Sequence, residues 1–162
     1  MKRVIIIGSP GAGKSTFSRK LRDKTGLPLH YLDLLYHRAD RTHVDREEFD
    51  AKLREIMATD AWILDGNFGR TIEMRMQQCD TVILMDYPVD VCLAGAKARV
   101  GVVREEMPWV EETLDEEFAQ WIREFPTTRL PEIYELLDKY KEGREVYIFH
   151  DRDEAEAFLR SL

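Results

Sequence analysis

The sequence lacks features that mark several large classes of protein. It has only two cysteines, Cys79 and Cys92, which lie in apolar surroundings without CxxC spacing. We therefore expect two buried thiols rather than a disulfide or a redox pair. The histidines are also few, and none has the spacing of a metal site such as HExxH; they are His30, His37, His43 and His150.

Long apolar runs and an excess of positive charge are missing too. No stretch approaches the ~18 apolar residues that a membrane span needs. The apolar run after Arg3 is too short for a signal peptide, so we expect a cytoplasmic protein. The formal net charge of −7 opposes non-specific binding to DNA, and we expect no direct contact with nucleic acid.

Strand-like and helix-like segments alternate along the chain, without internal repeats or linkers. The first, fourth and fifth apolar runs show little alternation, as in strands covered on both faces. The segments between the runs carry apolar residues at the helical period. This order predicts a parallel sheet with right-handed crossovers in a single domain over residues 1–162. The expected strands are residues 4–7, 29–32, 62–64, 81–85 and 146–149.

Local signals mark the ends of three helices and one unusual connection. The fourth crossover, from about residue 87 to 144, is far longer than the others, so we expect a lid or substrate-covering insertion within about residues 95–130. Two capping boxes, Asp45 with Glu48 and Thr113 with Glu116, mark the starts of two helices. We expect Pro126 to end the helix that starts at Thr113, Pro131 to open the next helix and Gly143 to close it.

The strongest motif comes directly after the first strand, in IIIGSPGAGKST at residues 5–16. It matches the Walker A pattern, with a strand before it and a helix after it. The loop amides and the helix N-terminus attract a phosphate chain, Lys14 reaches the β- and γ-phosphates, and the Ser15 hydroxyl ligates magnesium. ATP and Mg²⁺ are the predicted cofactors. The expected binding residues are Gly8, Ser9, Pro10, Gly11, Ala12, Gly13, Lys14, Ser15 and Thr16.

The rest of the chain narrows the class of P-loop protein. No guanine-reading NKxD is present, and neither ILDGN nor ILMDYP supplies the adjacent acidic pair of a regulatory ATPase. The small size and the style of the loop favour a small-molecule phosphotransferase.

A second motif, WILDGNFGRT at residues 62–71, ends the third strand with a carboxylate. A carboxylate at that edge of the sheet lies where the metal must bind. The motif resembles that of nucleoside monophosphate kinases, which implies that Asp65 orients magnesium-bound water and that Arg70 clamps an anionic group of the acceptor. Asp65 with Gly66 as a plain surface turn is the alternative.

Over most of its length the chain resembles the adenylate-kinase-like family of DNA topology modulation proteins, or FlaR. The stretches that carry the resemblance are GSPGAGKSTF, HYLDLLYH, ILDGNFGRT, DYPVDVCL, FAQWIREFP and TRLPEI. The family name derives from a phenotype and says little about chemistry. The resemblance implies a P-loop kinase core without naming the substrate.

Further site residues are suggested by kinases of this fold. A carboxylate after the second strand often faces the acceptor and can take its hydroxyl proton, which makes Asp33 the candidate base or acceptor-orienting residue; a helix-capping Asp is the alternative. Lid arginines neutralise the transferred phosphoryl group. Arg99 and Arg129 lie in the matching stretches and are the preferred candidates. Arg104 and Arg123 are the other two candidates, and each of the four could equally be a surface charge. Arg75, five residues beyond Arg70, is a further possible anion ligand.

At two positions the chain departs from the pattern of monophosphate kinases and related chains, and this weakens the assignment of AMP as the acceptor. Met74 stands where monophosphate kinases often have a base-reading Gln, and Gly95 stands where related chains have a basic lid residue. No base specificity is predicted.

These observations predict an ATP-dependent phosphotransferase with the P-loop NTPase fold. We expect a nucleoside monophosphate kinase-like α/β/α arrangement with strand order 2-3-1-4-5, acting as a monomer or weak homodimer. The acceptor is a nucleotide, a nucleoside or another small polar metabolite. Two rivals remain: a nucleotide-binding regulator whose lid is read by a partner, in a role related to DNA topology, and a slow ATPase without an acceptor.

Overall fold

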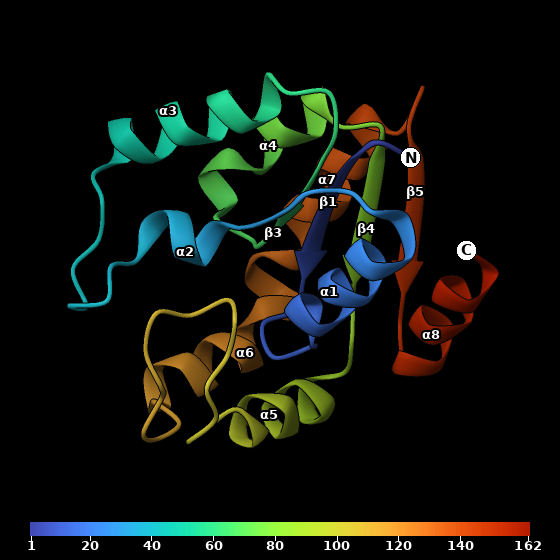
Figure 1. The fold of residues 1–162 in the computed structure, drawn as a ribbon. Coiled ribbons are helices and arrows are strands. Elements are labelled where there is room, and N and C mark those ends of the chain that lie inside the picture. The colour runs from blue at the N-terminus through green and yellow to red at the C-terminus, as the bar shows by residue number, and fades with distance from the viewer.

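The computed structural model describes residues 1–162 and is built around a five-stranded parallel sheet of order β2-β3-β1-β4-β5 (Figure 1). This confirms the predicted order, and all five expected runs form strands. Each strand differs from its expected bounds by one residue at most at either end. The strands are β1 (Arg3–Gly8), β2 (Leu29–Tyr31), β3 (Trp62–Asp65), β4 (Thr81–Met85) and β5 (Glu145–Phe149).

Helices fill every crossover between the strands. The fourth crossover holds three of them, α5, α6 and α7, with residues 99–115 between α5 and α6 outside any helix. We call residues 99–115 the α5–α6 connection. The helices are α1 (Lys14–Thr25), α2 (Leu32–Tyr36), α3 (Arg46–Met57), α4 (Gly69–Gln78), α5 (Val89–Ala98), α6 (Glu116–Thr128), α7 (Leu130–Tyr140) and α8 (Arg152–Ser161).

Two apolar cores lie on the two faces of the sheet. Side chains alternate along β1, so that Ile5 and Ile7 face one core while Val4 and Ile6 face the other. The first core includes α3, α4 and α7, and the second includes α1, α5 and α8 (Figure 1). The apolar residues of β1 and β4 are buried, so both faces of these strands are covered and their runs show no polar alternation. β5 shows little alternation as well, but it lies at the edge of the sheet and is only partly buried.

Capping explains where the sequence-based helix boundaries hold and where they fail. The carboxylate of Asp45 accepts a hydrogen bond from the Glu48 amide, as the capping box predicts. The box predicted at Thr113 is wrong, because Asp115 caps α6 instead and accepts from the Glu117 amide. Asp115 and Thr113 are both suitable N-cap residues, and Asp115 takes that position. Leu114 therefore lies outside the helix, where it packs against the core.

The proline prediction for α6 is also wrong. Pro126 lies inside α6, which continues to Thr128. Pro126 has no amide to donate to the Ile122 carbonyl four residues earlier. In the same last turn, the hydroxyls of Thr127 and Thr128 both donate to the Glu124 carbonyl. The next helix begins at Leu130 with Pro131 in its first turn, close to the prediction. It ends at Tyr140, before Gly143, which forms the turn into β5 with a φ of 76°.

Other features bear on what the molecule can bind. Both cysteines are buried and free, as predicted. No group of three or more His, Cys, Asp or Glu side chains is arranged to hold a metal ion by itself. None of the helices has both the length and the apolar character needed to cross a membrane.

Candidate active site

The Walker A loop joins β1 to α1 at the carboxyl edge of the sheet. Gly8, Gly11 and Gly13 have φ values of 136°, 81° and 93°, a region that favours glycine. Space is limiting as well, because a Cβ on Gly8 would overlap the Met85 backbone and one on Gly11 would overlap the Cys92 carbonyl. The glycines therefore let the loop fold tightly between β4 and α5, with α1 beginning at Lys14.

Lys14 turns back over its own loop. Its Nζ donates hydrogen bonds to the carbonyls of Gly8 at 3.1 Å and Ser9 at 3.0 Å. Burial lowers the pKa of Lys14 to about 8, although the negative charge of Asp65 opposes the shift. The ammonium group is thus held at the mouth of the loop with partners that a phosphate oxygen can replace.

Ser15 and Asp65 meet, although they are 50 residues apart in sequence. The Ser15 hydroxyl donates to Asp65 Oδ2 at 2.6 Å. Only 4% of Asp65 is exposed, and burial raises the pKa of its carboxyl to about 6, against the opposing effects of the Ser15 hydrogen bond and the charge of Lys14. A hydroxyl and a carboxylate side by side are ligands that fit Mg²⁺, which commonly takes one or two protein carboxylates together with substrate phosphates.

Asn67 is a site residue that the sequence analysis missed. Its side-chain oxygen accepts from the Gly8 amide at 3.0 Å, and its side-chain nitrogen donates to the Gly8 carbonyl at 2.8 Å. This two-point contact ties the loop after β3 to the start of the Walker A loop. No spacing rule identifies such a residue, because an Asn after a strand is also typical of an ordinary turn.

Arg75 stabilises the loop that follows β3. Its guanidinium is fully buried and donates to the carbonyls of Gly66, at 2.9 Å, and Asn67, and to the Thr71 hydroxyl at 3.1 Å. Burial lowers its pKa to about 9. Its donors are directed at two backbone carbonyls and one side-chain hydroxyl of the protein, whereas the sequence suggested a possible anion ligand. The available signal was its position on α4 between the buried Ile72 and Met76.

Asp33 lies on α2, near the Walker A lysine. Its side chain is 44% exposed, yet the surrounding protein raises the pKa of its carboxyl through burial. The positive charges that oppose this rise belong to His37, Lys14, Arg104 and Arg99, in decreasing order. Asp33 therefore lies near a group of cations, and solvent still reaches its side chain.

The predicted lid arginines divide into two groups. Arg99 is half-buried over the Phe118 ring at 5.8 Å, and Arg104 has a side chain that is only 10% exposed. Both act on Asp33, and burial lowers the pKa of Arg99 with help from the charge of Arg104. By contrast, Arg129 is 58% exposed and pairs with Glu132 at 3.5 Å. Arg123 is an exposed partner of Glu116.

Arg70 occupies a separate cleft. Its guanidinium forms a bidentate pair with Asp50 of α3, with distances of 3.0 and 2.7 Å. The structure does not bring Arg70 into contact with Asp65, Lys14 or Ser15. The cleft has a volume of about 430 Å³, and its lining residues are Tyr36, His43, Val44, Arg46, Phe49, Phe68, Gly69, Arg70 and Thr71.

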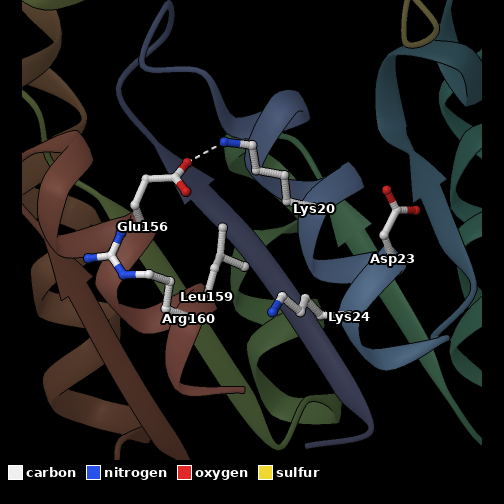
Figure 2. A pocket seen from close by; sticks show the side chains of 6 residues that line it. All are labelled: Lys20, Asp23, Lys24, Glu156, Leu159 and Arg160. Carbon is white, nitrogen blue, oxygen red and sulfur yellow. Dashed lines mark hydrogen bonds and ion pairs between the residues drawn. The ribbon is translucent and has the colours of Figure 1, made fainter.

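A second cleft, of about 300 Å³, lies between α1 and α8 (Figure 2). It is lined almost entirely by charged side chains, and an ion pair between Lys20 and Glu156 crosses it. None of its lining residues belongs to the Walker A loop or comes directly after a strand, so it is not part of the site described above.

Comparisons with known proteins bear on the fold of the chain. No protein-family model matches the chain. Adenylate kinases of Thermotoga neapolitana and Thermotoga maritima are each 27% identical to it over 97 residues, which is 58% of this chain and 43% of theirs. The chain thus spans less than half the length of these relatives.

Solved structures match over nearly the whole chain. Shikimate kinase from Acinetobacter baumannii in complex with shikimate gives a TM-score of 0.61 with 19% identity, covering 99% of this chain and 90% of that one. The enzyme from Bacteroides thetaiotaomicron gives 0.57 with 16% identity, covering 99% and 95%. The chain has a P-loop kinase fold. Adenylate kinase-like sequence and shikimate kinase-like structure point to the same core, and neither identifies the acceptor.

Proposed function

We propose that the protein is an ATP-dependent phosphotransferase that transfers the γ-phosphoryl group to a small polar acceptor. One observation carries the proposal: the contact of Ser15 with Asp65 directly beside Lys14. The loop alone can bind the phosphates of a nucleotide, and a hydroxyl with a buried carboxylate at the same edge of the sheet can also hold the Mg²⁺ that assists phosphoryl transfer.

The Walker A residues 8–16 would bind the phosphates of ATP. Ser15 and Asp65 would hold Mg²⁺, which neutralises phosphate oxygens when it is bound. Lys14 would exchange the carbonyls of Gly8 and Ser9 for phosphate oxygens. Asn67 and Arg75 would keep the surrounding loops in place, so that little rearrangement accompanies binding.

The acceptor would approach from α2. Asp33 is the candidate base or acceptor-orienting residue, since its raised pKa and its nearby cations suit a carboxylate that receives a hydroxyl proton. Arg99 would stabilise the transferred group, with Arg104 in support. Arg129 remains a candidate only if the α6–α7 junction moves, because its partner in this structure is Glu132.

The cleft that contains Arg70 is the candidate site for the rest of the acceptor. Its aromatic walls, Tyr36 and Phe68, suit an apolar or planar group, and Arg46 and Arg70 suit an anionic one. The guanidinium of Arg70 is already paired with the Asp50 carboxylate, so an anionic acceptor would compete with Asp50 for this guanidinium. The chain's membership of the topology modulation family is part of the same proposal, supported by the quoted sequence stretches.

ATP turnover by the purified protein with magnesium tests the proposal. The acceptor panel contains nucleoside monophosphates, nucleosides and small hydroxy acids, and Lys14→Ala provides the blank. We expect one class of acceptor to raise turnover about 100-fold or more over water, as positioned phosphoryl transfer does. Tight ATP binding with no acceptor effect would instead support the nucleotide-binding regulator.

A further inference from the structure

The α5–α6 connection is docked on α1 through two consecutive glutamates. Glu105 accepts hydrogen bonds from the Tyr31 hydroxyl and from Arg22, the latter at 3.2 Å. Glu106 accepts from Arg19 at 2.8 Å. Figure 1 shows this connection, drawn in yellow, as the long non-helical segment that joins α5 to α6.

The two glutamates differ sharply in their surroundings. The Glu105 side chain is 50% exposed, and its ion pair lies in solvent. Glu106 is 4% exposed, and its second oxygen accepts from Arg104 at 3.2 Å. One buried carboxylate therefore lies between an arginine of α1 and an arginine of the connection. Exposed ion pairs contribute little, whereas a buried carboxylate leaves its partners unpaired when it is lost.

The position of the Arg104 side chain depends on the Glu106 carboxylate. Its side chain is nine-tenths buried, and its Nε has no hydrogen-bond partner. Its other ion-pair partner, Glu111, is 3.9 Å away. Without the Glu106 carboxylate, the guanidinium groups of Arg19 and Arg104 would face each other with like charge, and repulsion would drive the connection away from α1.

The docked arginine is linked to the Walker A motif through hydrogen bonds. Glu106 accepts from Arg104 and from Arg19, and the Arg19 guanidinium also donates to the Thr16 hydroxyl at 3.3 Å. The charge of Arg104 also acts on Asp33 and on Arg99. We propose that Glu106 is a positioning residue that fixes Arg104 at the phosphate site by holding it against Arg19. The connection is then closed on α1 before the nucleotide binds. The inference rests on the proposed function only for the catalytic consequence of this closure.

Limited digestion of the full-length protein with trypsin, without nucleotide, measures the closure directly. The neighbouring Glu105→Gln variant is the matched control for Glu106→Gln. Cleavage within residues 99–115 is followed by mass spectrometry. We expect Glu106→Gln to be cut about tenfold faster than the unaltered protein, because local opening governs the rate. Glu105→Gln should stay within about twofold of the unaltered protein.

Kinetics separate positioning from simple loosening. With an acceptor from the panel, Glu106→Gln should lower kcat by about tenfold to 100-fold, as the loss of an aligned cation does, with less than about threefold change in the KM for ATP. If no acceptor is found, the proposed function fails, but the digestion still decides whether Glu106 closes the connection.

Equal resistance of Glu106→Gln and the unaltered protein, or equal sensitivity of the two variants, would overturn the inference. Tryptic sites outside residues 99–115 report on global unfolding. If those also open in Glu106→Gln, Arg19→Gln takes its place, because Arg19 lies on α1 with 30% of its side chain exposed. The same selective cleavage of the connection is expected, and its absence would also overturn the inference.

Discussion

In the proposed function Asp65 must be ionised in order to bind Mg²⁺, although its carboxyl group is buried. Burial favours the protonated form and raises its pKa to about 6. Ser15 and Lys14 reduce the rise but do not abolish it. Metal-dependent turnover should therefore fall as the pH drops through about 6, since a protonated Asp65 no longer offers a charged ligand.

The Asp65→Asn variant isolates the stability cost of this carboxyl. As pH rises from the ordinary value of 3.8, the unfolded chain releases the Asp65 proton before the folded chain does, so the unaltered protein loses stability until about pH 6. Asparagine does not titrate. Between pH 4 and 7 the free energy of unfolding of the variant should rise relative to the unaltered protein by up to ~3 kcal/mol. Urea denaturation at several pH values measures the difference, and a pH-independent difference would contradict the expectation.

Arg75 and Arg70 lie five positions apart and differ in what their loss should do. Arg75→Met leaves two backbone carbonyls without their donor and should lower the free energy of unfolding by about 2–4 kcal/mol. Arg70→Met breaks only the pair with Asp50 and should cost less than about 1 kcal/mol. Thermal and denaturant unfolding compare the two variants, and equal losses would show that the backbone contacts of Arg75 contribute little.

The two arginines also show where sequence reasoning at the residue scale ends. Lys14, Ser15 and Asp65 could be predicted to lie together because a phosphate loop and a metal require those groups at the ends of neighbouring strands. The partner of Arg70 is set by the packing of α3 against α4, and that of Arg75 by the path of the loop after β3. Neither partner can be deduced from spacing along the chain.

At the scale of elements, α5 braces the Walker A loop. Gly95 of α5 lies directly against the Gly11 carbonyl, and a Cβ on Gly95 would overlap that oxygen. The sequence presents Gly95 only as a departure from a basic lid residue. The structure gives a different reason for the residue, which is the close approach of helix and loop. Such an approach depends on tertiary packing and has no local signal.

Gly95→Ala tests this contact, and Gly69→Ala is its control. Overlap with the Gly11 backbone should displace the loop, lower the free energy of unfolding by about 1–3 kcal/mol and weaken ATP binding about tenfold. A Cβ on Gly69 meets no atom within 4 Å, so that variant should change stability by less than about 0.5 kcal/mol. Calorimetric titration with ATP distinguishes them. Unchanged affinity in Gly95→Ala would mean that the loop tolerates displacement.

At the scale of the whole molecule, the strand order assembles the site. β1 lies between β3 and β4, with Ile6 paired to Asp65 in register, so the Walker A loop and the loop after β3 emerge side by side. This order could be predicted because alternating strands and helices with right-handed crossovers allow few arrangements. The acceptor could not be predicted, since it depends on the shape of a cleft formed by three separate helices and their loops.

The fate of the γ-phosphoryl group decides whether the protein is a phosphotransferase. Purified protein is incubated with magnesium and ATP labelled in that group, together with a pool of small metabolites, and Lys14→Ala serves as the blank. We expect the label to appear in a new small-molecule phosphate, at a rate that depends on Asp65. Label that remains in ATP or appears only as inorganic phosphate would contradict the phosphotransferase.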